Sequence, residues 1–126
     1  LYLSEGTDPK DVLDDVPKRL VIEYFWSIGG DAIREAGEEI LKRNVSEATF
    51  ASLRERVERI GRLYEDVEPG DRYALTYVPG RGTTLAKNDR ELGTIEGADF
   101  ARAYFAIWLG EEPIDASLRD QLLRGR

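Results

Sequence analysis

The side chains whose types and spacing could build a site are aromatic, and they gather in three stretches of the sequence. Tyr24–Trp26 end a run that alternates like a strand, and Tyr73 and Tyr77 alternate in a second run. The third stretch has helical spacing and holds Phe100, Tyr104, Phe105 and Trp108. Since a buried indole N–H or phenol O–H needs a hydrogen-bond partner, these residues could form a plain core or an apolar pocket with polar tips. The plain core is the more common outcome, and the pocket would suit an elongated or aromatic ligand.

The residue types that are missing exclude most other chemistry. The 126 residues include no Cys, no His and no Met, which removes disulfides, thiolate nucleophiles, zinc ribbons and any Ser-His-Asp triad. With 25 acidic and 18 basic residues the net charge is −7, which argues against nucleic acid and anionic membranes as partners. No apolar run approaches the roughly 18 residues of a membrane span. Composition therefore leaves a soluble, acidic, single-domain protein over residues 1–126. We expect it to hold no metal and no cofactor.

Three weaker patterns have simpler explanations than a site. The glycines of Gly29–Gly30 and Gly80–Gly82 do not fit a phosphate-binding loop, and turns use glycine in the same way. A cluster of acids at Asp11, Asp14 and Asp15 lacks the spacing of a calcium loop. Alternating arginine and glutamate over residues 54–62 is typical of a solvated helix face. Nothing singles out two of the 25 acids as a catalytic pair.

Hydrophobic periodicity predicts the elements that would position the aromatic residues. We predict helices over residues 8–16, 31–43, 46–64 and 98–109, and a last helix from 115 or 117 to 123. We predict strands over residues 1–3, 18–27, 73–78, 83–86 and 92–95. Asp31 is the expected cap of its helix. The pattern indicates an α+β fold, with one antiparallel meander and helices against one side.

The last third of the chain carries a more specific pattern. It comprises an aromatic residue at a helix start, a Trp-Leu-Gly-x-x-Pro-Ile step and a final Leu-Arg-x-x-Leu-Leu helix. These are Phe100, Trp108–Gly110, Pro113–Ile114, Leu118–Arg119 and Leu122–Leu123. In this pattern the chain resembles the chalcone isomerase-like superfamily, in particular its bacterial branch. Leu1–Leu3 and Pro17–Leu20 also resemble the segments that flank the first helix of that family.

The resemblance implies a strongly curved antiparallel β-sheet with helices packed on one face, an open-faced sandwich that encloses an apolar cleft. It also implies that the family's first strands lie upstream of Leu1, so we expect residues 1–126 to be an N-terminally truncated domain. We expect the cleft walls to come from Trp26, Tyr104, Ile107 and Trp108, with Trp108 mostly buried. Bacterial members often carry an export signal, which favours the periplasm or secretion.

The family's enzymes close a phenolate onto an enone without cofactor or metal, and the resemblance implies which residues would do so. They use an Arg and a Thr on early strands, a Tyr and an Asn near a strand-to-helix passage, and a Thr or Ser on the late helix. Here the passage Ser27–Gly37 holds no Tyr or Asn, and the late-helix position falls near Ile107–Trp108, which has no hydroxyl. We therefore expect no catalytic residues, and a non-catalytic protein whose cleft binds a fatty acid or similar small apolar ligand. The alternatives are a cofactor-free isomerase (an intramolecular lyase) and a structural or protein-interaction module.

Overall fold

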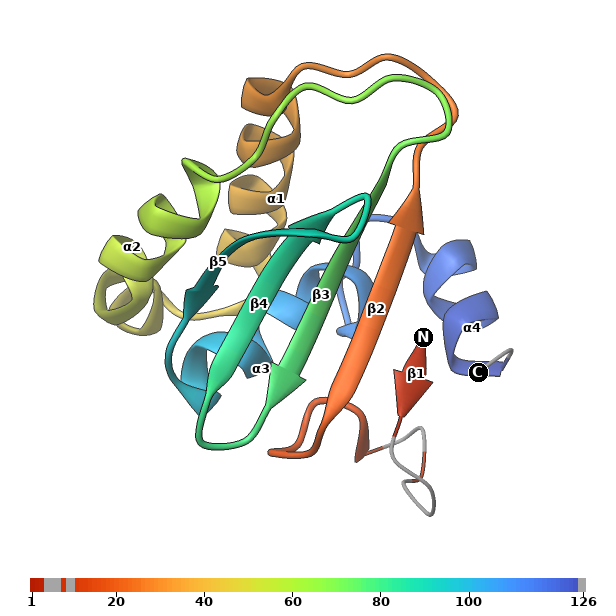
Figure 1. The fold of residues 1–126 in the computed structure, drawn as a ribbon. Coiled ribbons are helices and arrows are strands. Elements are labelled where there is room, and N and C mark those ends of the chain that lie inside the picture. Colours follow the sequence, from red (N-terminus) through yellow and green to blue (C-terminus); the bar gives the residue numbers. More distant parts are fainter. Residues whose placement is uncertain (4–7, 9–10, 125–126) are drawn as a thin grey trace.

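The fold is a five-stranded antiparallel sheet in a computed structural model that describes residues 1–3, 8 and 11–124. The strands lie side by side in chain order (Figure 1). They are β1 Tyr2–Leu3, β2 Lys18–Glu23, β3 Arg72–Val78, β4 Gly82–Lys87 and β5 Arg90–Ile95. The register joins β3, β4 and β5 by antiparallel pairing throughout. The predicted meander is thus confirmed.

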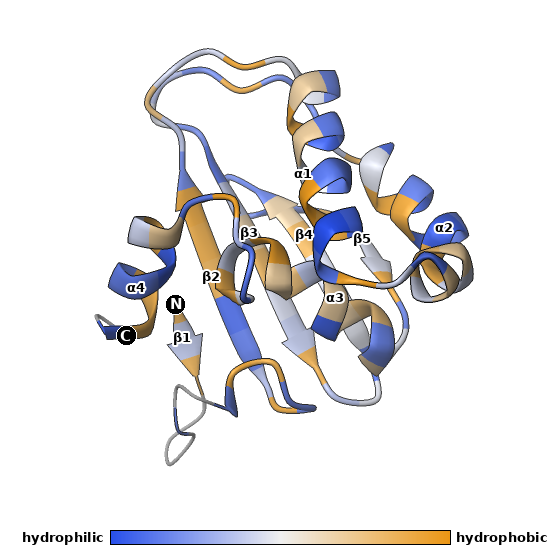
Figure 2. Cartoon of the chain, turned by 180° about the vertical axis from the view of Figure 1, so that it is seen from behind, coloured by the Kyte–Doolittle hydropathy of each residue, from blue (hydrophilic) through white to orange (hydrophobic). Residues whose placement is uncertain are grey.

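The helices lie on one face of this sheet. Those in the described part of the chain are α1 Gly30–Asn44, α2 Glu47–Gly61, α3 Ala98–Leu109 and α4 Ala116–Arg124. Figure 2, seen from behind, shows α3 lying across the strands, with α1 and α2 to one side of it and α4 to the other. No helix in the described ranges is long and apolar enough to cross a membrane. The α+β class with helices on one face is confirmed.

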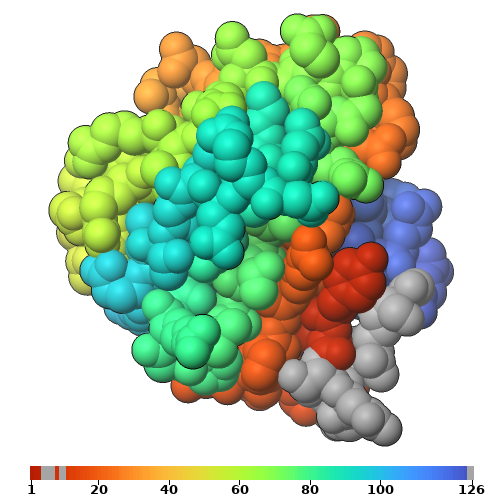
Figure 3. All heavy atoms as spheres, in the orientation of Figure 1, coloured from red at the N-terminus to blue at the C-terminus, as the bar shows by residue number. Residues whose placement is uncertain are grey.

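Alternation along the strands decides which face of the sheet the helices cover. In β3 the side chains of Tyr73, Leu75 and Tyr77 are buried, and the register places Leu20 of β2 opposite Leu75. The intervening residues, such as Val78, point to the other face, which forms the surface seen in Figure 3. Because side chains alternate across a strand, this set lies on one face of the sheet, the face that the helices cover, where the Tyr73 ring contacts Tyr64 just after α2.

Two helices begin at the residues that the sequence predicts. Ser46 caps α2, accepting a hydrogen bond from the Thr49 backbone N–H at 3.1 Å. Gly97 precedes α3 with φ +107, a conformation that favours glycine, and a Cβ there would collide with Arg56. Along α3 the apolar side chains are buried almost all round, which matches its wide apolar surface in the sequence.

Three local predictions are wrong. Residues 12–16 form turns and bends instead of a helix, while Pro9, at its predicted start, lies outside the described residues. Asp31 does not cap α1; instead the Gly30 N–H donates to Asp66 Oδ1 at 2.7 Å. Strand β2 ends at Glu23 and does not reach residue 27.

The early end of β2 has a visible cause in its backbone hydrogen bonds. Tyr24 N–H donates to Asp71 O at 2.9 Å, and Gly70 N–H donates to Tyr24 O at 2.8 Å. The chain is therefore drawn into a loop that runs beside residues 66–71, as the two upper loops of Figure 1 show. Phe25 and Trp26 lie in that loop and are exposed at 66% and 73%.

Candidate functional site

Three of the four predicted ligand contacts lie together on α3. Tyr104 and Ile107 are buried, and Trp108 is partly buried against the core. The Tyr104 ring stacks on Phe100 at 5.1 Å and meets the edge of Trp108 at 5.8 Å. These side chains form a packed layer on the side of α3 that faces the core, where Ile107 lies beside Gly37 of α1.

One polar contact stands inside this layer. The hydroxyl oxygens of Tyr64 and Tyr104 lie 2.7 Å apart. Burial raises the pKa of both phenols well above the ordinary value of 10.0. Both side chains are therefore neutral at physiological pH, and their hydroxyl groups satisfy each other in an apolar environment.

Trp26, the fourth predicted contact, does not join the other three. Its ring makes an edge contact with Phe25 at 6.4 Å and is mostly exposed. It was expected inside because the alternation of residues 18–27 continues through Trp26, whereas the strand itself ends at Glu23.

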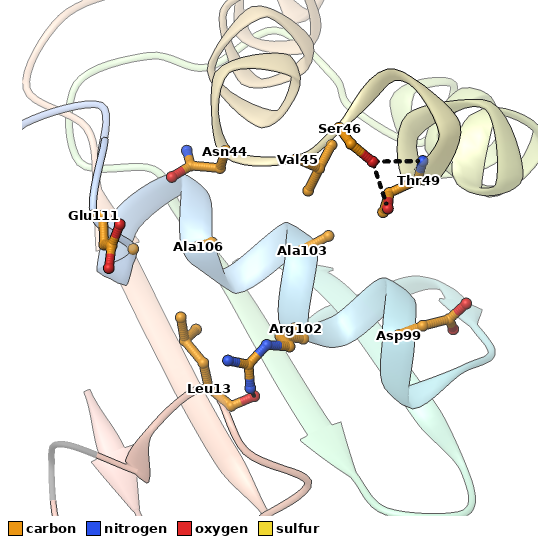
Figure 4. A pocket seen from close by; sticks show the side chains of 11 residues that line it. Leu13, Asn44, Val45, Ser46, Thr49, Asp99, Arg102, Ala103, Ala106 and Glu111 are labelled. Carbon is orange, nitrogen blue, oxygen red and sulfur yellow. Dashed lines mark hydrogen bonds between the residues drawn. The ribbon is translucent and has the colours of Figure 1, made fainter.

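A hollow lies on the side of α3 that faces away from the sheet, and we call it the α3 hollow. Its volume is about 510 Å³, within the range of about 300–1,000 Å³ usual for small-molecule sites. Ala103 and Ala106 form its floor, while Val45 and Leu13 stand on opposite sides (Figure 4). The other lining residues are Asn44, Ser46, Thr49, Asp99, Arg102, Gly110 and Glu111.

Most polar groups around the α3 hollow are bound to other parts of the protein. The Asn44 side chain donates to Glu112 O at 2.9 Å and accepts from Glu112 N–H at 3.1 Å. Asp99 accepts two hydrogen bonds from Arg56, at 2.8 and 2.9 Å, which hold its pKa below the ordinary value. Ser46 is occupied in capping α2. The polar groups at the rim are therefore engaged within the protein, and the floor and sides of the hollow are apolar.

Arg102 supplies a positive charge at the edge of the α3 hollow. Its Nη1 donates to Leu13 O at 3.2 Å and lies 3.4 Å from Asp14 Oδ1. The Arg102 side chain is 63% exposed and that of Asp14 is 59% exposed. A guanidinium in this position is open to other acceptors, and it is suited to a carboxylate.

The turn that carries Leu13 is held to the body of the protein by a buried lysine. Lys18 is 3% exposed, and its Nζ donates to Asp14 O at 2.8 Å and to Val16 O at 3.3 Å. The ammonium also lies over the rings of Tyr77 and Phe105, at 4.9 and 5.4 Å. Burial lowers the pKa of Lys18 from 10.5 to about 8, against the opposing effect of nearby carboxylates.

Tyr77 makes a second contact with the same turn. Its hydroxyl donates to Asp15 Oδ1. Burial, followed by this hydrogen bond, raises the pKa of Tyr77 to about 12. One side of the α3 hollow is therefore a turn anchored at several points.

Chemically, the α3 hollow combines apolar walls with one available cation. No group of three or more acidic side chains within the described ranges could hold a metal ion. Sequence reasoning did not find this place, because its lining comes from segments far apart in the chain. The only local signal is the pair Ala103 and Ala106 beside Arg102, which indicates a face of α3 that small side chains leave open.

Comparison with known proteins shows the family of this chain and a similar fold. The family described as Chalcone isomerase-like matches residues 1–124. Among solved structures, the Arabidopsis thaliana fatty-acid binding protein AtFAP1 is similar, with a TM-score of 0.73 and 17% sequence identity. That match covers 97% of this chain and 68% of AtFAP1. No curated protein sequence matches the chain. Because the family match extends over nearly the whole sequence and the fold agrees with it, the chain belongs to the chalcone isomerase-like family.

Proposed function

We propose that this protein is a non-catalytic member of its family that binds a fatty acid, or a similar small hydrophobic carboxylate, in the α3 hollow. The observation that carries the proposal is the combination of a hollow of about 510 Å³ with an apolar floor and a guanidinium at its edge. An acyl chain would lie along Ala103 and Ala106, where burial of apolar surface stabilises it. Its carboxylate would reach Arg102.

The similar structure supports the same ligand class. AtFAP1 is described as a fatty-acid binding protein, and its fold matches nearly all of this chain. Contact of the ligand with Trp26, Tyr104, Ile107 and Trp108 stays a prediction. It would require the ligand to enter the packed layer that faces the core, on the other side of the helix that floors the hollow.

We also propose that the chain belongs to the bacterial branch of the family, and the sequence pattern that follows α3 supports this proposal. Gly110 ends the helix, and a Cβ there would lie 2.7 Å from Ala106 O. Ile114 N–H then donates to Ile107 O at 2.7 Å, which turns the chain towards α4. This geometry explains why a Trp-Leu-Gly-x-x-Pro-Ile pattern would recur, since glycine is the residue that fits the close approach.

A different function, docking to another protein, has one observation in its favour. Phe25 and Trp26 are both exposed, and neighbouring large apolar side chains at the surface are typical of interaction sites. We rank this function second because α3 carries its apolar surface inward, and Trp108, which an interaction module would expose, is partly buried.

Thermal unfolding with and without sodium decanoate tests the ligand-binding proposal. A ligand that binds only the folded state raises Tm, because it stabilises that state by mass action. We expect decanoate to raise Tm of the wild type. Ala106→Leu should abolish the shift by filling the floor, whereas Ala51→Leu, the same change on an exposed face of α2, should preserve it.

Two results would count against the proposal. Absence of any shift in the wild type at millimolar decanoate would contradict binding altogether. A shift that persists in Ala106→Leu would place the ligand elsewhere, and Trp108→Phe would then test the packed layer that faces the core.

A further inference from the structure

Arg102 already has an anionic neighbour from its own chain. The Asp14 carboxylate lies 3.4 Å from Arg102 Nη1, at the edge of the α3 hollow. Both side chains are more than half exposed. Exposed ion pairs of this kind contribute little to stability, so the partner of Arg102 can be exchanged at little cost.

Two other acids on this side of α3, Asp99 and Asp15, are occupied in the structure, while Glu111 lines the hollow at the C-terminal end of α3 (Figure 4). Asp99 is held by Arg56 through two hydrogen bonds, and it also accepts from the Phe100 N–H at 2.8 Å. Asp15 accepts from the Tyr77 hydroxyl. Within the described residues, Asp14 is thus the carboxylate that Arg102 holds.

The wall of the hollow does not depend on the Asp14 side chain. Lys18 holds the turn through the backbone oxygens of Asp14 and Val16, and Val12 is buried in the core. Arg102 itself bonds Leu13 through the backbone oxygen. The Asp14 carboxylate can therefore leave Arg102 while Leu13 keeps its place.

From these contacts we propose that Asp14 is an internal competitor for Arg102, and that it sets how strongly the α3 hollow prefers carboxylates over neutral apolar ligands. This inference rests on the proposed function. A ligand carboxylate must displace Asp14 before it can pair with Arg102, whereas an alcohol of the same chain length has no such competition. Asp14 thus lowers the affinity for anions selectively.

Calorimetric titration of the full chain with decanoate and with decanol tests the inference. We expect Asp14→Asn to bind decanoate about two- to fivefold more tightly, which is the effect of losing one exposed ion pair, and decanol unchanged. Glu23→Gln, at the far end of β2 from Lys18, removes the same charge and is the matched control. It should change neither the affinity for decanoate nor that for decanol. Arg102→Gln should weaken decanoate alone, and adding Asp14→Asn to it should have no further effect.

Several outcomes would overturn the inference. Asp14→Asn could change the affinities for decanoate and decanol equally, or change neither affinity. It could also raise the affinity for decanoate in the Arg102→Gln background. Each would show that Asp14 does not act through the guanidinium. If the wild type binds decanoate and decanol but Asp14→Asn has no selective effect, the inference fails while the proposed function stands. If it binds neither ligand, both fail.

Discussion

The hydroxyl oxygens of Tyr64 and Tyr104 lie 2.7 Å apart, and this contact joins the segment after α2 to the middle of α3. The Tyr64 ring also meets the edge of Tyr73, with ring centres 5.0 Å apart. Helix α3 is therefore connected through these tyrosines to both the helical layer and the sheet. With the ring contacts of Tyr104 to Phe100 and Trp108, this hydrogen bond holds one side of α3 against the core, while Ala103 and Ala106 line the hollow.

Removing either hydroxyl of this pair should destabilise the protein. We expect Tyr64→Phe and Tyr104→Phe each to lower the free energy of unfolding by about 1 kcal/mol, because the remaining hydroxyl is left without its partner. The double variant should lose less than the sum of the two, since the groups act on each other. Chemical denaturation measures all three. Tyr2→Phe, at an exposed position of β1, is the control and should have little effect.

The two tryptophans should differ sharply in their contribution to stability. Trp108→Ala removes a ring that packs on Tyr104 and the core, so we expect a loss of about 2–4 kcal/mol in the free energy of unfolding. Trp26→Ala should stay within about 0.5 kcal/mol of the wild type, because that ring is 73% exposed. Losses of similar size would contradict this placement of the two rings.

The buried Lys18 predicts a rise of stability with pH. Its pKa is about 8 in the folded state and has an ordinary value of 10.5, which the unfolded chain should show. Between these values the unfolded state binds more protons at this site, so the free energy of unfolding increases with pH. Between pH 7.5 and 9.5 we expect a gain of about 2 kcal/mol from this residue.

Lys18→Met isolates this effect. The free energy of unfolding of the variant should lack this rise with pH. The difference in free energy of unfolding between the wild type and the variant therefore gives the contribution of Lys18 alone. The measurement should stop below pH 10, because Tyr24 and Tyr77 have pKa values raised to about 12 and their ionisation favours the unfolded chain at higher pH. A difference that is flat across this range would show that the Lys18 ammonium is not affected by burial.

Chalcone cyclisation should be absent. Residues 27–37 include no Tyr or Asn, and Tyr24, in the loop before them, packs edge-on against Tyr73. Ile107, at the late-helix position, is fully buried and has no hydroxyl. Without groups that stabilise a developing oxyanion, the rate enhancement of an isomerase is lost. Absorbance of a chalcone over time should therefore follow the buffer control. Turnover above that control would favour the isomerase alternative.

Local periodicity was sufficient for most of the fold. Helix α3 occupies residues 98–109 as predicted, because Gly97 and Gly110 mark its ends and apolar residues fill the turns between them. The strands from Tyr73 to Ile95 follow from alternation and two turns. In each case the signal and the structure involve neighbours in the chain.

The errors arise where distant residues decide the outcome. Trp26 continues a strand pattern, yet the backbone of Tyr24 pairs with Asp71 and Gly70, far along the chain. The α3 hollow has the same origin, since Leu13, Val45 and Ala106 meet only in the folded structure. Lys18 shares the buried face of β2 with Leu20, as alternation indicates, but the rings that its ammonium contacts, Tyr77 and Phe105, come from distant parts of the chain.

The hydrogen bond from the Gly30 N–H to Asp66 Oδ1 has a consequence for the order of folding. Gly29, at the cap position of α1, offers no side chain, so the helix obtains its cap from Asp66, which lies 36 positions after Gly30. A fragment that ends with α2 would contain both helices and lack that carboxylate. Because closing so long a loop costs entropy before the contact forms, we expect the first turn of α1 to become protected from hydrogen exchange only when β2 and β3 pair. We thus expect the first turn of α1 to form late in folding, after the strands have paired.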